Sequence, residues 1–289
     1  MTELATPVAA WQPSDLELSR RALRRRATTK SVLVALISSV VVAVVLVVVV
    51  VNTPGWEVVR QTFFDPQVAL DSFWPILQGL GVNIVVLLVG AVGVAIFATL
   101  LAILRSLRGP VFFPLRFLAT AYTDLFRGVP LILVLYLVGF GVPALQLFPR
   151  VPAVVWGTIA IIISYSAYVA EVLRAGMEAV HPSQRIAARS LGLTHGQTLR
   201  IVVIPQGVRK VVPALMNDFV SMQKDVGLIS VLGVVDAVRA AQLQVAETFN
   251  YTPYVVAGIF FIILSWPMIR LTDTFTARLN KREQAGGIV

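Results

Sequence analysis

The chain has no cysteine and few charged residues, and both absences narrow what it can be. Without a cysteine among its 289 residues it has no disulfide framework, no thiolate metal site and no thiol nucleophile. Only 13% of the residues are charged, about half the share of roughly a quarter found in soluble domains. Its two histidines, His181 and His195, lie in one short stretch, and no His-Glu-x-x-His or Gly-x-Ser-x-Gly motif is present. These absences argue against an intramembrane enzyme.

Long apolar runs occupy much of the sequence instead. Hydrophobic residues make up 57% of the chain, and the mean hydropathy is +0.83. Residues 31–51 are almost entirely Val, Leu, Ala, Ile and Ser, and about 20 such residues cross a hydrocarbon core of roughly 30 Å. Similar runs cover about 76–104, 128–148, 152–170 and 253–269. Backbone groups in lipid must be satisfied within a segment, and the alternating strands of a barrel are lacking, so we predict an all-α integral membrane protein.

The distribution of positive charge predicts the topology. Six cations between Arg20 and Lys30 precede the first run, which is too long for a signal peptide and has no small-x-small cleavage site after Val51. We therefore expect an uncleaved first helix. Six crossings from a cytoplasmic N-terminus place nineteen of the 24 Lys and Arg residues on inner segments and three on outer ones. The sequence thus predicts six spans with both termini cytoplasmic. Because the distribution of the +9 net charge is explained by this orientation, we expect no nucleic-acid partner.

The fifth predicted span, from about 205 to 234, carries a polar stripe. At about 100° per residue its five polar side chains fall within an arc of about 120°. They are Asn217, Asp218, Ser221, Lys224 and Asp225. A polar stripe inside a membrane must face protein or water. Two interpretations remain open: a buried polar seam that holds helices together, or the wall of a pathway for a polar solute, which we favour because three of the five can ionise.

A shorter stripe lies on the fourth span. Ser164, Tyr168 and Glu171 share one face at i, i+4 and i+7 spacing. Glu171 is a second candidate for the pathway, although an ion pair with Arg174 three residues later is the alternative. Asp124 and Arg127, at the start of the predicted third span, are interpreted as a local pair or as snorkelling side chains at the inner interface.

The segment between the fourth and fifth spans contains a short predicted helix. Pro182-Ser183 is typical of a helix start and Gly192 of a helix end. A short amphipathic helix on the inner face can lie on the membrane, or it can insert into a groove on a soluble partner.

The same segment resembles a known motif. Ile186-Ala187-Ala188-x-x-x-Gly192, followed after nine residues by Val202-x-Ile204-Pro205, is similar to the EAA loop of ATP-binding-cassette (ABC) importer permeases. Ile186 replaces the usual Glu of that loop, and Ile204 replaces its usual Leu.

Three other stretches resemble the polar amino acid permease subfamily. They are Phe-Arg-Gly-Val-Pro-Leu at 126–131, Ala-Tyr-Val-Ala-Glu-Val-Leu-Arg-Ala-Gly at 167–176, and Gln-Lys-Asp-Val-Gly-Leu-Ile-Ser-Val at 223–231. In the last of these, Val226-Gly227 replaces the family's Thr-Ser. The resemblance covers roughly residues 76–275, so residues 1–75 are an extension of it.

The resemblance implies a domain organisation. A type I permease core of five helices would occupy 76–275, with its docking loop at about 175–204. Before the core lie a basic cytoplasmic tail (1–30), a first transmembrane helix (31–51) and an external loop (52–75), and a cytoplasmic tail (276–289) follows it.

The resemblance also implies partners and site residues. The chain lacks a Gly-x-x-x-x-Gly-Lys-Ser/Thr loop, and in this family a separate ATPase dimer binds ATP and Mg. An extracytoplasmic solute-binding protein delivers the solute, and a second permease subunit, either a copy or a paralogue, completes the pore in the bacterial plasma membrane. The docking residues would be Ala187, Ala188, Gly192 and Pro205. Those of the solute pathway would be Glu171, Asn217, Asp218, Ser221, Lys224 and Asp225, which suit a polar amino acid.

Alternatives remain within and outside this class. An importer of the same class could carry an amino-acid derivative such as ectoine or an opine. A secondary carrier usually shows two related halves, and no such repeat is visible. The first helix is interpreted as an extra membrane anchor.

Overall fold

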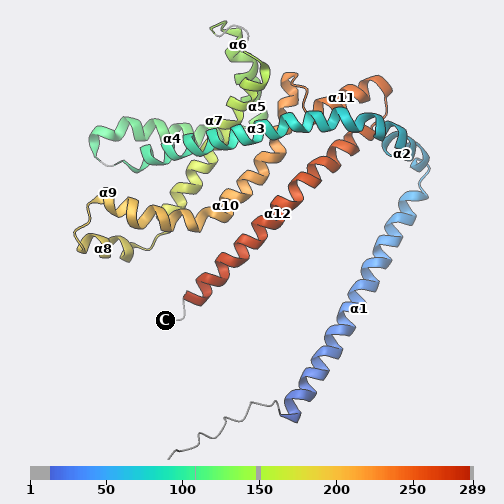
Figure 1. The fold of residues 1–289 in the computed structure, drawn as a ribbon, viewed down its shortest axis with the longest axis horizontal. Helices are drawn as coiled ribbons and strands as arrows, with labels where there is room; N and C mark the ends of the chain where they lie inside the picture. The colour runs from blue at the N-terminus through green and yellow to red at the C-terminus, as the bar shows by residue number, and fades with distance from the viewer. Residues whose placement is uncertain (1–13, 108, 148–150, 287–289) are drawn as a thin grey trace, which may run out of the picture. The chain divides into compact units, whose positions relative to one another are not determined.

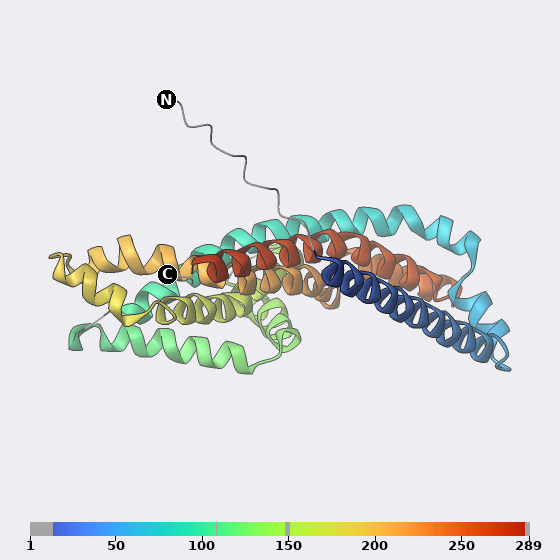
Figure 2. The same cartoon turned by 90° about the horizontal axis from the view of Figure 1, so that it is seen from below.

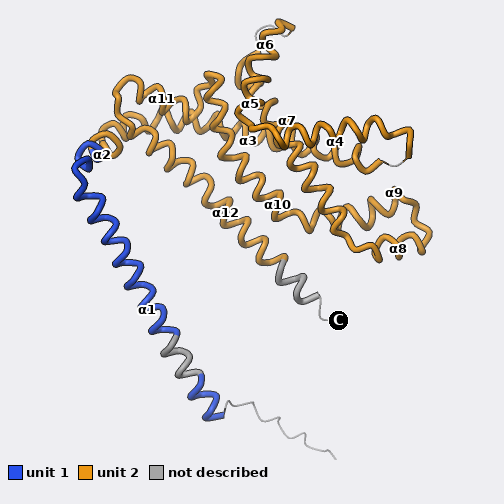
Figure 3. Tube along the Cα trace, turned by 180° about the vertical axis from the view of Figure 1, so that it is seen from behind, with its two compact units in different colours: residues 1–60 blue, residues 61–289 orange. Residues whose placement is uncertain are grey.

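The computed structural model describes residues 14–107, 109–147 and 151–286, without the side chains of 21–27 and 280–286. The chain forms two compact units, residues 1–60 and 61–289 (Figure 3). Every regular element in the described ranges is helical, so the predicted all-α class is confirmed for them.

The first unit is dominated by a single long helix. Helix α1 (Asp15–Val51) begins at Ser14, whose side chain accepts a hydrogen bond from the backbone N–H of Glu17 at 3.4 Å. Every side chain from 28 to 51 is exposed. A helix that is apolar on all sides is stable against lipid, which agrees with a membrane span. The predicted tail at 1–30 is therefore helical from Asp15 onward, and residues 1–13 lie outside the described part.

The second unit contains the remaining long helices (Figure 1). Helix α2 (Trp56–Phe63) straddles the boundary between the two units. In chain order there follow α3 (Pro66–Ser106), α4 (Phe113–Gly128), α5 (Leu131–Tyr136), α6 (Val142–Ala144), α7 (Ala153–Glu178), α8 (Pro182–Ser190), α9 (His195–Thr198), α10 (Ile204–Asp225), α11 (Ala237–Thr248) and α12 (Thr252–Gly286). Four short segments join them: 3-10 helices at Pro110–Phe112 and Val226–Leu232, and π-helical turns at Leu137–Gly141 and Leu199–Val203.

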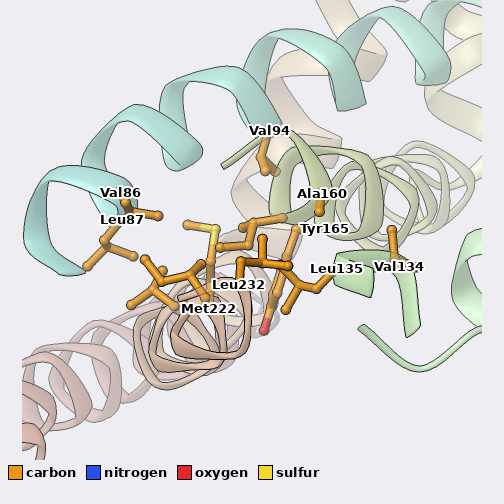
Figure 4. Close-up of a cluster of buried hydrophobic side chains, with 12 residues drawn as sticks. Val86, Leu87, Val94, Val134, Leu135, Ala160, Tyr165, Met222 and Leu232 are labelled. Atoms are coloured by element: carbon orange, nitrogen blue, oxygen red, sulfur yellow. The ribbon is translucent and has the colours of Figure 1, made fainter. Parts of the chain in front are cut away.

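The largest core cluster lies among α3, α7, α10 and the turn after α10. Buried side chains from these elements point toward one another, including Leu87, Tyr165, Met222 and Leu232 (Figure 4). Within a bilayer such contacts replace lipid contacts, so close packing rather than release of water holds the helices together.

Glycines let α7 and α10 approach closely. A methyl group built on Gly207 would lie 2.9 Å from the carbonyl oxygen of Gly176, and one on Gly176 would lie 2.5 Å from Val211. Real side chains do not make such contacts, so the crossing requires glycine on both helices.

In the described part of the chain, four helices are long and apolar enough to cross a membrane. Counting each of two bent pairs of helices as one further span gives up to six spans.

The predicted third span, 128–148, is wrong as a single straight helix. The pair Pro110–Gly128 and Leu131–Ala144 meets at 110°. Pro130 has no backbone N–H and forces Val129 into an extended conformation, which ends α4.

Two segments that were predicted as an external loop and a cytoplasmic tail contain helix. The predicted loop at 52–75 contains α2 and the start of α3, because Asp65 accepts hydrogen bonds from the N–H groups of Gln67 and Val68 and Pro66 follows as the first helical residue. The predicted tail at 276–289 continues α12 to Gly286.

A buried polar joint fixes the bend before α11. Asn83 donates to Asp236 Oδ2 at 2.9 Å and to the carbonyl of Val226 at 3.2 Å, and accepts from the N–H of Ala237 at 3.0 Å. Asp236 is fully buried and also accepts from the N–H of Arg239. One turn earlier on α3, a methyl group on Gly79 would lie 2.4 Å from the backbone of Asp236. The joint therefore ties α3 to α11 through backbone and side chain together.

Replacing Asn83 by alanine is expected to destabilise the folded protein by about 3 kcal/mol, because it leaves a buried carboxylate without its side-chain donor. Thermal unfolding in detergent, monitored by size-exclusion chromatography, measures this change. Gly81→Ala is the control, since nothing lies within 4 Å of a methyl group there. Equal melting temperatures for N83A and G81A would show that the joint contributes nothing.

Candidate functional site

The polar stripe on α10 divides into an exposed and an inward part. Asn217, Ser221 and Lys224 are exposed on the surface of the chain, whereas Asp218 and Asp225 are half-buried against α7 and α3. The two aspartates lie at one edge of the predicted arc, which is why they alone reach the interior. All five residues lie on α10, and the predicted stripe borders two environments.

Asp218 faces a cavity of about 350 Å³ between α3, α7 and α10, here called the Asp218 cavity. Its wall is mostly apolar, with Thr99, Tyr165 and Asp218 as its polar members. Among the described residues, the Oδ2 atom of Asp218 has no hydrogen-bond partner. A buried carboxylate oxygen without a donor is costly, so this position is suited to a donor that arrives from outside the chain.

Asp225 lies about two turns further along α10 and has a partner within the chain. Its Oδ2 accepts a hydrogen bond from the Tyr165 hydroxyl at 2.7 Å, and Tyr165 also lines the Asp218 cavity. This contact joins the two aspartates to α7 through one aromatic side chain.

Glu171 lies in a cluster of arginines rather than at the Asp218 cavity. It pairs with Arg105 of α3 at 2.7 Å, with Arg127 of α4 at 4.0 Å, and with Arg174 one turn further along α7. The alternative interpretation, an ion pair with Arg174, is thus present and extended by two further cations. The structure does not bring Glu171 together with Asp218 and Asp225 at one cavity.

Glu171→Gln is expected to lower stability by about 2 kcal/mol, since it removes the shared partner of arginines that are only partly exposed. Thermal unfolding of the detergent-purified chain measures this. Glu57→Gln, whose ion pair with Arg60 is exposed on both sides, is expected to change stability little. A Glu171→Gln protein that unfolds normally but transports poorly would assign Glu171 to the pathway instead.

The other polar residues of the fourth predicted span differ in their partners. The Tyr168 hydroxyl donates to the Arg127 carbonyl at 3.2 Å, whereas Ser164 is buried and its Oγ has no hydrogen-bond partner among the described residues. Arg127 pairs with Glu171, so the predicted local pair between Asp124 and Arg127 is replaced by a contact between helices. No group of three or more His, Asp or Glu side chains in the described ranges comes together as a metal site.

The predicted docking segment folds as a short helix with defined ends. Helix α8 begins at Pro182, and its cap is His181, whose ring nitrogen accepts from the N–H of Ser183 at 3.2 Å. It ends at Ser190 and is followed by Leu191 as its C-cap and by Gly192, which has φ +81°, and the N–H of Leu193 donates to the carbonyl of Ala188 at 3.2 Å. The following α9 starts with a capping box between Thr194 and Gln197. The glycine stop predicted from sequence is confirmed.

The two alanines of α8 differ in burial. Ala188 is buried against the rest of the unit, whereas Ala187 is exposed. Ile186 of α8 and Leu191, the residue after the helix, are 66% and 83% exposed, so this segment presents apolar side chains outward. Pro205 lies in the first turn of α10 and is exposed.

Comparison with known proteins assigns the chain to a family. Residues 109–282 match the family described as binding-protein-dependent transport system inner membrane component. The chain belongs to this family. It is a type I ABC permease of the polar amino acid subfamily, and such a chain is a transport subunit rather than an enzyme.

Named relatives of the permease agree with this assignment. The arginine transport system permease protein ArtQ of Bacillus subtilis is 33% identical over 191 residues, which cover 65% of this chain and 85% of ArtQ. A probable amino-acid ABC transporter permease, y4tG of Sinorhizobium fredii, is 34% identical over 209 residues, covering 72% and 88%.

Solved structures share the fold of the permease. A crystal structure of an amino acid ABC transporter with histidines is 31% identical, with a TM-score of 0.65, and covers 71% of this chain and 94% of that one. The MetNI methionine ABC transporter superposes with a TM-score of 0.59 at 14% identity, covering 71% and 96%, which shows likeness of fold alone.

Sequence reasoning missed the polar residues that hold the helices together. Asn83 and Asp236 form the buried joint, and Gln223 is fully buried with the Ser265 hydroxyl donating to it. The signal available was a lone polar residue within an apolar run, as at Asn83 and Ser265. That signal predicts a buried hydrogen bond but does not name the partner.

Proposed function

We propose that this permease imports a polar amino acid, and that Asp218 binds the ammonium group of the solute. The observation that carries the proposal is the unpartnered Asp218 carboxylate at a cavity between three membrane helices. Ionisable groups in such positions are costly to keep and mark solute pathways. A cation that enters the cavity supplies the missing donors.

The remaining polar groups of α10 suit the rest of an amino acid. Lys224 can pair with the α-carboxylate, while Asn217 and Ser221 can donate to or accept from polar side chains. Asp225, held by Tyr165, adds a second negative charge. Two carboxylates and one ammonium favour a cationic or zwitterionic solute. The names of curated relatives, which include arginine and glutamine transport proteins, support this class.

A second permease subunit is expected against the exposed part of the stripe. Asn217, Ser221 and Lys224 lie on the outer surface of a membrane helix, where contact with lipid would leave them unsatisfied. A partner subunit would cover them and close the pathway between two α10 helices. Either a second copy of this chain or a paralogue fits this role.

The end of the unit that carries α8 is proposed to face the cytoplasm, with both termini on the same side. This orientation follows the positive-charge bias of the sequence. It would place α8 where a separate ATPase dimer, which binds ATP and Mg, can receive it. An external binding protein would then deliver solute to the opposite side.

Coupling is proposed to pass through α8 as a rigid helix. Its buried Ala188 packs on the unit and its exposed edge, with Ile186 and Leu191, is free to enter a groove on the ATPase. Closure of the ATPase dimer would move α8, and the helices packed through Gly176 and Gly207 would rock to open the pathway alternately to each side.

Co-purification tests the proposed assembly. The tagged chain is extracted in mild detergent from its native host, and the co-purifying proteins are identified by mass spectrometry. Because the chain has no cysteine, Ala187→Cys provides a single attachment point for a thiol-to-amine cross-linker. Leu147→Cys, exposed in the loop after α6, is the control.

We expect an ABC ATPase to co-purify and to cross-link from Ala187→Cys but not from Leu147→Cys. A second permease chain in the same sample would identify the pair as a heterodimer. An ATPase that cross-links equally from both positions, or is missing from both samples, contradicts the proposed docking.

A further inference from the structure

A second cavity, of about 290 Å³, lies where the ends of five helices meet. The helices are α3, α4, α7, α8 and α9, and they lie at the end of the unit where α3 turns into α4 (Figures 1 and 2). Each of the five helices contributes one arginine or histidine side chain to its wall. These are Arg105, Arg116, Arg174, Arg185 and His195. We call it the arginine cavity.

Carboxylates neutralise only part of this wall. Glu171 pairs with Arg105 and Arg174, and Glu178 pairs with Arg174 as well. Four guanidinium groups against these two carboxylates leave two formal positive charges.

Arg116 and Arg185 carry that excess charge. Arg116 donates to the carbonyl of Leu107 at 3.0 Å, and Arg185 donates to the carbonyl of Met177 at 2.6 Å. In the described part of the chain, no ion pair joins either of them to a carboxylate. Both are half-buried, and a carbonyl occupies only part of a five-donor guanidinium fork.

We propose that the arginine cavity binds a phosphate group, carried by the headgroup of an anionic phospholipid. Guanidinium groups match phosphate oxygens in bidentate geometry. At about 290 Å³ the cavity is just below the roughly 300–1,000 Å³ range of small-ligand sites, which fits a headgroup better than a larger solute. Basic pockets between membrane helices at a cytoplasmic surface, where anionic lipids concentrate, bind such headgroups.

Headgroup binding there would brace the docking segment. Arg185 belongs to α8 and His195 to α9, whereas Arg105, Arg116 and Arg174 belong to the membrane helices. A phosphate shared between these groups would join α8 and α9 to the ends of α3, α4 and α7. The role does not depend on which solute the permease carries.

Native mass spectrometry of the detergent-purified protein, with whatever subunits co-purify, tests the site. The probes are phosphatidylglycerol, phosphatidylcholine and inorganic phosphate, each added alone. The double variant Arg116→Gln/Arg185→Gln removes the two excess charges. Arg209→Gln/Arg278→Gln, which removes two exposed arginines outside the cavity, is the matched control. If the first variant does not elute as a folded peak, Arg185→Gln alone replaces it, with Arg209→Gln as its control.

We expect the protein to retain phosphatidylglycerol in preference to phosphatidylcholine. Each cavity arginine that is removed is expected to weaken phosphatidylglycerol binding by about tenfold, and the control variant is expected to bind it unchanged. If inorganic phosphate binds with the same dependence and phosphatidylglycerol does not, the phosphate site stands and its ligand is a soluble anion. If the cavity variant and the control variant bind lipid and phosphate equally well, the proposed site is wrong. Loss of the ATPase from Arg116→Gln/Arg185→Gln with lipid binding intact would also overturn the site, because the cavity would then receive an acidic group of that partner.

Discussion

Replacing Asp218 by asparagine is expected to reduce solute uptake by about 10- to 100-fold while leaving the assembled protein intact. The substitution keeps the size of the side chain but removes the charge that faces the Asp218 cavity, and a hydrogen bond to a charged group contributes about 1.5–3 kcal/mol. Because Oδ2 has no partner within the described residues, the change breaks no contact that the fold depends on. Uptake of labelled arginine, glutamine and histidine into cells that express the complete importer measures the loss.

Asp273→Asn is the matched control for that experiment. Asp273 lies on α12, and its side chain and that of its partner Arg270 are both mostly exposed. The same chemical change there is expected to leave uptake within about twofold, as for most exposed ion pairs. Normal uptake by Asp218→Asn would assign the aspartate to a structural seam. Competition by an amino-acid derivative, with none by free amino acids, would keep the pathway but change the solute.

Replacing Gly192 by valine is expected to uncouple transport from ATP hydrolysis, with uptake reduced by about tenfold or more. Gly192 has φ +81°, a conformation that a β-branched residue adopts only at a cost of about 1–3 kcal/mol. A methyl group at this position meets nothing within 4 Å, so the effect acts through the backbone that ends α8 and not through a clash. ATP hydrolysis and uptake, measured together in proteoliposomes, separate coupling from activity.

Gly192→Asn provides the control, because asparagine tolerates the left-handed conformation far better than valine does. It is expected to retain most of the uptake. If valine and asparagine behave alike, the conformation of Gly192 has no part in coupling. If valine also prevents membrane insertion, the position supports folding and the coupling role is withdrawn.

Local patterns predicted α8 well. A proline at the start and a glycine at the end determine hydrogen bonds within a few residues, so the helix and its stop follow from sequence alone. The cap could not be predicted, because His181 acts through a ring nitrogen rather than through the usual hydroxyl of Ser183.

Helical periodicity predicted the stripe on α10 but not its division. The angle between side chains is a property of one helix, whereas burial depends on which neighbours pack beside it. Asp218 and Asp225 face inward because α3 and α7 lie on their side of α10, and hydropathy alone does not supply that arrangement.

Contacts between distant segments were beyond the sequence patterns. Glu171 could be matched with Arg174 because both lie on one helix, but Arg105 and Arg127 reach it from α3 and α4. The third span was misjudged for a related reason. A scan of apolar residues follows composition, and the extended conformation of Val129 before Pro130 ends the helix within an apolar region.

ATP-dependent uptake by the reconstituted complex tests the central claim most directly. The permease, together with the ATPase that co-purifies with it, is placed in liposomes, and labelled amino acid is supplied on one side with its binding protein. The account predicts accumulation that requires ATP on the side of α8 and falls with Asp218→Asn. Accumulation driven by an ion gradient without ATP, or no dependence on Asp218, would contradict it.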